Sequence, residues 1–127
     1  MAYSKDYKYT KEHEWIQVQG NVGTVGITDH AQESLGDIVF VELPKVGVQV
    51  TASSSFGSVE SVKAVSDLYA PVSGKVVAVN EDLNQTPEAI NQDANSAWMI
   101  KIELSDPKEL DALLTAEQYE AFIAEEK

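Results

Sequence analysis

Short runs of alternating apolar and polar residues, each bounded by turn-forming residues, restrict the folds open to this sequence. Trp15-Ile16-Gln17-Val18-Gln19 alternates, Gly20-Asn21 makes a turn, and a second strand-like run follows over residues 22–27. Further strand candidates lie at residues 37–43, 46–50, 59–62, 64–69, 75–80 and 100–104. No helical crossover of the kind that joins parallel strands is expected between them. The pattern therefore predicts a mainly β fold of packed antiparallel sheets.

The helices that the sequence predicts are short and gather mainly at the carboxyl end. Thr28 can cap a helix of one or two turns that ends at Gly36, and Pro87 marks a further helical turn. Residues 106–109 and 115–118 match the capping-box pattern, so two helices are expected near the end of the chain. The most apolar strand candidate, residues 37–43, is expected in the core. We expect residues 1–127 to form one domain, with residues 105–127 as a helical extension packed on it.

Charge and composition exclude several classes of function. The formal net charge is -12, so the clustered Lys and Arg that bind a phosphate backbone are missing and nucleic acid is not an expected partner. An acidic surface instead favours basic protein partners. The chain has no cysteine, so any sulfur chemistry has to arrive on an attached cofactor. No apolar run is long enough to cross a bilayer and the amino end lacks a secretory h-region, so we expect a soluble, unsecreted protein.

One lysine lies midway between two strand-like runs. Residues 59–62 and 64–69 suit the arms of a hairpin, which places Val62-Lys63 at the turn. Tight two-residue turns favour Asn, Asp or Gly, so turn propensity does not explain these residues. A lysine at the tip of a rigid hairpin extends away from the body and can reach another protein, as an attachment point must. The alternative is an ordinary solvated lysine.

The segments around this lysine carry a family resemblance. Glu60-Ser61-Val62-Lys63-Ala64 resembles the lipoyl attachment motif, whereas biotinyl domains place Met on both sides of their lysine. Blocks similar to those of the glycine cleavage system H-protein family cover most of the chain in order, at residues 9–15, 25–32, 35–44 and 69–74. Residues 94–98 and Ala52-Ser53 depart from that family's usual pattern, in loops where alanine tolerates a positive φ poorly.

The resemblance implies a barrel-sandwich hybrid fold with lipoic acid amide-linked to Lys63. The chain would have no catalytic activity of its own and would shuttle the aminomethyl group of glycine on its lipoyl-lysine arm. The partners implied are the pyridoxal-phosphate-dependent glycine decarboxylase, the tetrahydrofolate-dependent aminomethyltransferase, dihydrolipoyl dehydrogenase, and a lipoate ligase or lipoyltransferase. We expect a monomer in a bacterial cytoplasm or, if a transit peptide has been removed, in a mitochondrial matrix.

Carboxylates near the lysine could serve such an arm. Glu60 could be read by the lipoylating enzyme. Glu12, Glu14 and Asp67 are candidates for docking the loaded arm, because a cleft that excludes water would protect it and a carboxylate could meet its amine. Each of the four could equally be a solvated surface carboxylate.

Other functions stay open on sequence alone. A small hydrolase could use pairs among Glu12, Glu14 and Asp67 as acid and base. The chain could also relay lipoyl groups to other carrier domains, or act as an unlipoylated interaction module. His13 and His30 are far apart in sequence and lack the close spacing of metal ligands, so no metal site is expected and His30 is assigned a structural role in its helix.

Overall fold

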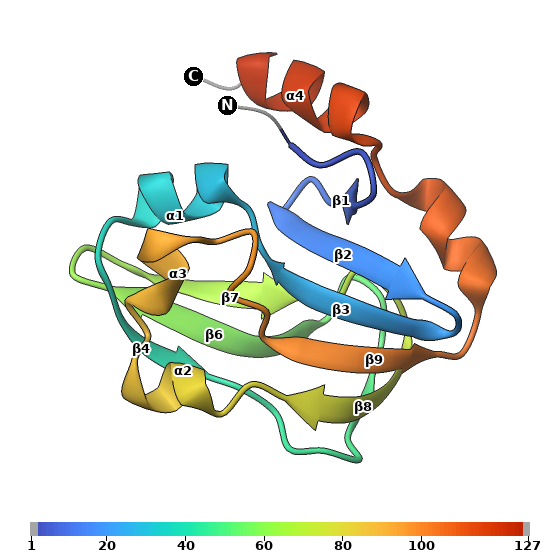
Figure 1. The fold of residues 1–127 in the computed structure, drawn as a ribbon, viewed down its shortest axis with the longest axis horizontal. Helices are drawn as coiled ribbons and strands as arrows, with labels where there is room; N and C mark the ends of the chain where they lie inside the picture. Colours follow the sequence, from blue (N-terminus) through green and yellow to red (C-terminus); the bar gives the residue numbers. More distant parts are fainter. Residues whose placement is uncertain (1–2, 126–127) are drawn as a thin grey trace.

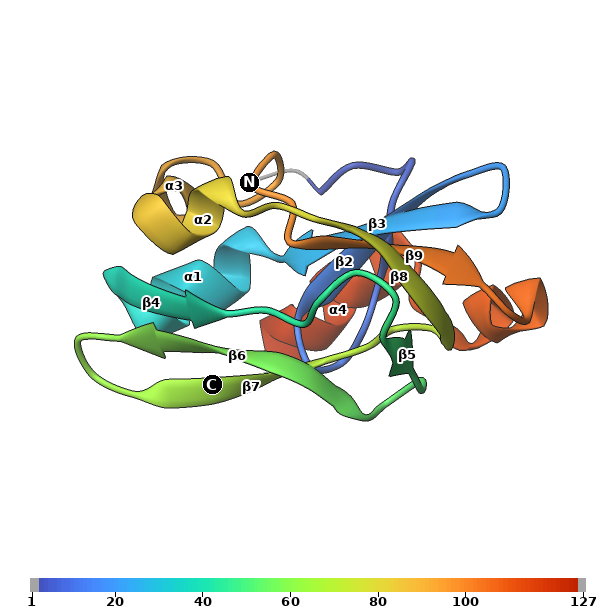
Figure 2. The same cartoon turned by 90° about the horizontal axis from the view of Figure 1, so that it is seen from below.

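The computed structural model describes residues 3–125 and shows two antiparallel sheets packed face to face (Figure 1, Figure 2). The larger sheet has the strand order β1 (Lys8–Tyr9), β2 (Glu14–Gln19), β3 (Val22–Ile27), β9 (Ile100–Leu104), β8 (Gly74–Val79), β5 (Gln49–Val50). The smaller sheet has the order β4 (Ile38–Glu42), β6 (Ser55–Ser61), β7 (Val65–Tyr69). The predicted mainly β, antiparallel architecture is confirmed.

Short helices lie at the ends of the two sheets, and the last helix lies beside β1 (Figure 1). They are α1 (Asp29–Leu35), α2 (Asp82–Gln85), α3 (Ala89–Gln92), the 3-10 helix η1 (Pro107–Ala112) and α4 (Ala116–Glu125). The Thr28 hydroxyl accepts from Ala31 N at 3.2 Å to cap α1, and Gly36 ends that helix at φ 80°. The expected capping box before α4 is present: Thr115 N donates to Gln118 Oε1 and Gln118 N donates to Thr115 Oγ1. None of the helices within residues 3–125 is long and apolar enough to span a membrane.

The main core lies between the two sheets and is built by strand alternation. Side chains alternate in direction along a regular strand, and those that turn inward from the two sheets meet in this core. The larger sheet contributes Ile16, Val25, Val76, Ile100 and Ile102, and the smaller sheet contributes Ile38, Val41, Val59 and Leu68, all of them buried. Removing this apolar surface from water is the main stabilising term of the fold.

A second cluster of aromatic side chains joins α4 to the start of the chain. The rings of Tyr9 and Tyr119 stack with centroids 4.9 Å apart, and Tyr3 meets both edge-on. Tyr9 and Leu114 also exchange both of their backbone hydrogen bonds, at 2.9 and 2.8 Å. The predicted helical segment at the carboxyl end is therefore attached to the sheets through β1.

The strand expected at the core, residues 37–43, contributes buried residues to it but also exposes several others. In β4, Ile38 and Val41 are buried, whereas Val39 and Phe40 are exposed. The register shifts between Ile38 and Phe40 where β4 pairs with β6, which is the mark of a β-bulge. The bulge turns two successive residues outward and lets Glu42 face solvent. Apolar content correctly placed this strand at the core but does not show which of its residues turn outward, because the bulge depends on pairing with β6.

Candidate functional site

Lys63 lies at the tip of the β6–β7 hairpin, as predicted. The hairpin projects from one end of the molecule (Figure 2), and Lys63 is exposed there beside the equally exposed Val62 and Ala64. Backbone pairing through β6 and β7 runs up to Glu60 and Val65, and Ser61 N donates to Ala64 O at 2.8 Å. A rigid base thus holds an accessible lysine.

Hydrogen bonds to the Ser61 side chain stabilise the turn at Val62-Lys63, whose residues have no preference for tight turns. Its hydroxyl accepts hydrogen bonds from Lys63 N at 3.2 Å and Ala64 N at 3.1 Å. Val62 N donates to Asp37 O at 3.0 Å, which ties the tip to the segment before β4. Val62 and Lys63 both keep a negative φ, so the turn needs no glycine. Serine side chains that bond to the following backbone are a known turn device, and a serine two residues before the lysine was the signal that sequence reasoning missed.

Replacing Ser61 with alanine is expected to lower the free energy of unfolding by about 1–2 kcal/mol, because two turn N–H groups lose their acceptor. Urea unfolding measures the loss, and faster hydrogen exchange at the Lys63 and Ala64 amides localises it. Ser66→Ala is the matched control, since that hydroxyl makes only a 3.5 Å bond to Asp67 O on the hairpin's exposed surface. Equal effects from the two variants would contradict the role given to Ser61.

The Lys63 stem lies against the turn between α1 and β4. A Cβ placed on Gly36 would sit 3.5 Å from Lys63 Cε, in ordinary van der Waals contact. Gly36 also has φ 80°, which favours glycine. The unmodified side chain therefore rests on the β4 side of the hairpin.

Among the four candidate carboxyls Glu12, Glu14, Glu60 and Asp67, Glu14 is the one that is buried. It begins β2, is only 1% exposed, and accepts from the Thr10 hydroxyl at 2.6 Å. Its other oxygen accepts from Tyr69 N at 3.2 Å, at the far end of β7 from Lys63. Burial raises the pKa of the Glu14 carboxyl from 4.5 to about 7, although these hydrogen bonds act in the opposite direction. Glu14 is thus the candidate that the structure links directly to the hairpin.

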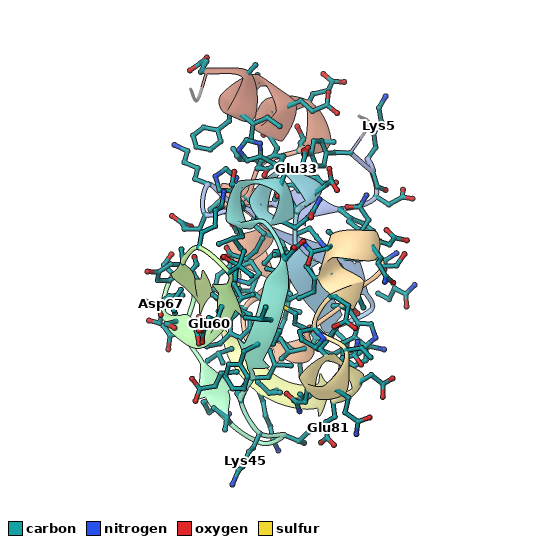
Figure 3. The ribbon with its side chains drawn as sticks, turned by 90° about the vertical axis from the view of Figure 1, so that its left-hand side faces the viewer. Lys5, Glu33, Lys45, Glu60, Asp67 and Glu81 are labelled. Carbon is teal, nitrogen blue, oxygen red and sulfur yellow. The ribbon has the colours of Figure 1, made fainter. Side chains whose placement is uncertain are left out.

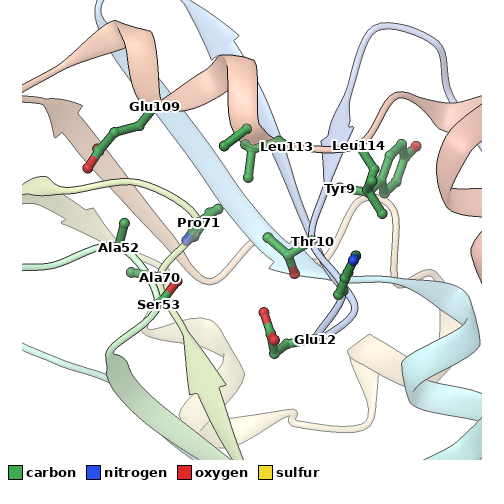
Figure 4. A pocket seen from close by; sticks show the side chains of 12 residues that line it. Tyr9, Thr10, Glu12, Ala52, Ser53, Ala70, Pro71, Glu109, Leu113 and Leu114 are labelled. Carbon is green, nitrogen blue, oxygen red and sulfur yellow. The ribbon is translucent and has the colours of Figure 1, made fainter.

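A cavity of about 280 Å³ opens beside this carboxyl. Figure 4 shows Glu12 and Thr10 on one side of it, with Ala70 and Pro71 opposite. Thr10, whose hydroxyl donates to Glu14, lines this cavity, and Tyr69, whose N–H donates to the other Glu14 oxygen, directly precedes the lining residue Ala70. Glu14 itself does not line the cavity and is linked to it through these two neighbours.

The segment after β9 supplies a further wall through Glu109. Its two carboxylate oxygens accept from Ser73 N at 2.6 Å and from the Ser73 hydroxyl at 2.9 Å. The Ser73 hydroxyl in turn accepts from Ala52 N at 2.9 Å. These bonds join three segments around the cavity, and no local sequence pattern predicts them.

The other predicted carboxylates lie in different places. Glu12 is exposed at the cavity rim, whereas Glu60 and Asp67 project from the outer face of the smaller sheet (Figure 3). Asp67 is two residues from Tyr69 on β7. The structure thus brings Glu12 and Glu14 together near Thr10 and leaves Glu60 and Asp67 along the hairpin.

The two histidines meet although they are distant in sequence. Their ring centroids are 4.8 Å apart, and His13 Nδ1 lies 2.8 Å from the Tyr119 hydroxyl, which is also 2.7 Å from Thr28 Oγ1. Within residues 3–125, no group of three or more His, Cys, Asp or Glu side chains is placed to hold a metal ion. The pair belongs to the contact between α4, α1 and the loop before β2.

Comparison with known proteins gives one consistent result. The family described as "Glycine cleavage H-protein" matches residues 7–126. The chain is 68% identical over 126 residues to the glycine cleavage system H protein of Koribacter versatilis, covering 99% of this chain and 98% of the relative. The corresponding protein of Acidobacterium capsulatum is 66% identical over 126 residues, with the same coverage.

A solved structure agrees with the fold. The crystal structure of a glycine cleavage system H protein from Mycobacterium marinum superposes with a TM-score of 0.88 at 41% identity, covering 96% of this chain and 99% of that one. The barrel-sandwich hybrid and the carrier function implied by the resemblance are confirmed by these matches, and the hydrolase alternative is not retained. The chain therefore belongs to the glycine cleavage H-protein family, as a non-catalytic lipoyl carrier of the aminomethyl group that works with glycine decarboxylase, aminomethyltransferase, dihydrolipoyl dehydrogenase and a lipoylating enzyme.

Proposed function

We propose that Lys63 is the lysine that carries lipoic acid. The supporting observation is its position at the tip of a hairpin whose turn is held by Ser61 and Asp37. Attachment joins the lipoic acid carboxyl to the lysine amine with loss of water, so a cationic amine becomes a neutral amide. When attached, the dithiolane supplies the sulfur that this cysteine-free chain lacks.

We propose further that the loaded arm docks along β7, toward the cavity beside Glu14. Ala64 O and Ala70 N bond toward β6, whereas Tyr69 N points away from it and meets Glu14. Backbone groups alternate in direction along a strand, so those of Val65 and Asp67 also face the open edge of β7. This edge is a polar track that leads from Lys63 to the cavity.

The residues at the end of this track suit a cationic amine. Glu14 can hold a proton near neutral pH or ionise when a cation approaches, since its pKa is about 7. Glu12 at the rim and Asp67 on β7 add negative charge on the way, and the cavity wall reduces access of water. We assign all three residues to arm docking, and Glu60, beside the tip, to recognition by the lipoylating enzyme.

Titration of the Glu14 carboxyl tests the docking proposal. We expect its pKa, about 7 in the unlipoylated chain, to fall by about one unit or more when the arm carries its amine, because a nearby cation favours the ionised form. Carbon-detected NMR of the carboxyl across pH 4 to 9 measures the change, with the exposed Glu117 as internal control. A Glu14 titration that is identical in loaded and unloaded chains would exclude docking beside it.

We also propose that residues 1–127 act as a single lipoyl-carrier domain, with 105–127 as its carboxyl-terminal helical extension. The backbone bonds between Tyr9 and Leu114 and the stacking of Tyr9 on Tyr119 support this for the described residues.

Because the matched relatives are bacterial, we place the protein in the bacterial cytoplasm, which cell fractionation tests.

A further inference from the structure

The outer face of the smaller sheet carries exposed apolar side chains next to Lys63. Phe40 on β4 pairs with Glu60 on β6, and Glu60 pairs with Val65 on β7, so the three residues form one row across the sheet. Phe40 is 53% exposed and Val65 is 67% exposed. Val62 at the tip and Val39 in the bulge are 67% and 50% exposed. We call Val39, Phe40, Val62 and Val65 the hairpin patch.

The bulge in β4 creates half of this patch. Without it, strict alternation from the buried Ile38 would turn Phe40 inward and Val41 outward. The shifted register instead exposes Val39 and Phe40 together on the edge nearest the tip. Exposed apolar residues gathered around one functional group mark an interaction surface more often than scattered ones do.

An acidic row follows the patch on the same face. Glu42 pairs with Ser58, and Ser58 pairs with Asp67, two residues further from the tip than the row through Glu60. Glu42 and Asp67 are exposed, and the Ser58 hydroxyl donates to Glu42 at 3.5 Å. Figure 3 shows Glu60 and Asp67 projecting from this side of the hairpin. The surface next to Lys63 is therefore apolar around the single carboxylate of Glu60, and the surface further from Lys63 carries the two carboxylates of Glu42 and Asp67.

We propose that the hairpin patch is the docking surface for the enzyme that attaches the lipoyl group to unmodified Lys63. This inference rests on the proposed function of Lys63. Decarboxylase, aminomethyltransferase and dehydrogenase all meet the lipoyl group as part of their substrate. The attaching enzyme meets a bare lysine, so its binding energy has to come from the protein surface around that lysine.

The same surface indicates the chemistry of its partner. The enzyme is expected to present an apolar strip beside its active-site entrance, a basic residue against Glu60, and Lys or Arg about 7 Å further along against Glu42 and Asp67. The apolar strip supplies affinity, and the basic residues supply orientation and the rate of encounter.

Comparison of two matched double variants tests the inference. Phe40→Thr with Val65→Thr removes two of the four residues of the patch, including its aromatic ring, while keeping residues that favour strands. Val46→Thr with Val77→Thr changes two exposed valines outside the patch. We expect kcat/KM for lipoate attachment to fall about tenfold or more in the patch variant, mainly through KM, and to stay within about twofold in the control. Thermal unfolding of both variants confirms that each is folded.

The same variants, fully lipoylated, are then assayed as substrates of glycine decarboxylase. Normal decarboxylation together with slow attachment supports the inference, and Glu42→Gln should additionally weaken the dependence of attachment on salt. Attachment at the control rate overturns it, and slow decarboxylation with normal attachment would assign the patch to the decarboxylase instead. If the wild-type chain is not modified at Lys63, the proposed function fails together with this inference.

Discussion

Replacing Lys63 with arginine is expected to abolish aminomethyl transfer without loss of the fold. A guanidinium keeps the positive charge but does not serve as the amine for the lipoyl amide. Lys63 is exposed and its stem lies over Gly36, so the free energy of unfolding should change by no more than about 0.5 kcal/mol. Glycine cleavage with the partner enzymes reconstituted should fall to the level measured without the carrier.

Lys45→Arg is the matched control, because Lys45 is also an exposed lysine and lies in the loop after β4. It should be lipoylated and support glycine cleavage at the wild-type rate. Cleavage above background with the Lys63 variant would show that another group carries the arm.

Replacing Glu14 with glutamine is expected to stabilise the protein at pH 8 and to have little effect at pH 5. Because folding raises the pKa of Glu14 from 4.5 to about 7, the folded state binds the proton more tightly and wild-type stability falls as pH rises between these values. The buried carboxylate then costs up to about 3 kcal/mol above pH 7. A neutral amide can still accept from Tyr69 N and donate to Thr10 Oγ1, so we expect a gain of about 1–3 kcal/mol at pH 8.

Urea unfolding at pH 5 and pH 8 measures this difference, with Glu12→Gln as control because Glu12 is an exposed carboxylate in the turn just before β2. If the gain from Glu14→Gln does not depend on pH, the carboxyl does not titrate as its burial implies. If the amine docks beside Glu14 as proposed, the loaded variant should also lose its aminomethyl group to water about tenfold faster, since the amine then lacks an anionic partner.

Much of the fold follows from local sequence patterns. Alternation predicts most strands, and the Thr28 cap, the glycine that ends α1 at Gly36 and the capping box at Thr115 are recognisable because each depends on residues within a few positions. The departures at Ala52-Ser53 and residues 94–98 leave the loops ordered. Ser53 adopts the positive φ of 72°, and Ala94 O accepts from Trp15 Nε1 at 3.0 Å.

The distinction among the candidate carboxylates did not follow from the sequence. The sequence does not distinguish Glu12, Glu14 and Asp67, but Glu14 is buried and accepts a hydrogen bond from Tyr69, 55 residues away. The bond between Glu109 and Ser73 spans 36 residues. The bulge at Val39 depends on pairing with β6. Contacts between residues this far apart in the sequence form only when the strands pair and the two sheets pack. Local sequence patterns therefore do not predict them.

The most direct test of the account is the site of lipoylation. The chain is treated with lipoate ligase, ATP and lipoic acid, then cleaved after Phe56 and Tyr69 to release residues 57–69, in which Lys63 is the sole lysine. Mass spectrometry of that peptide should show one lipoyl group, with every other lysine unmodified. An unmodified peptide, with the lipoyl group elsewhere or absent, would contradict the assignment of Lys63 as the anchor of the arm.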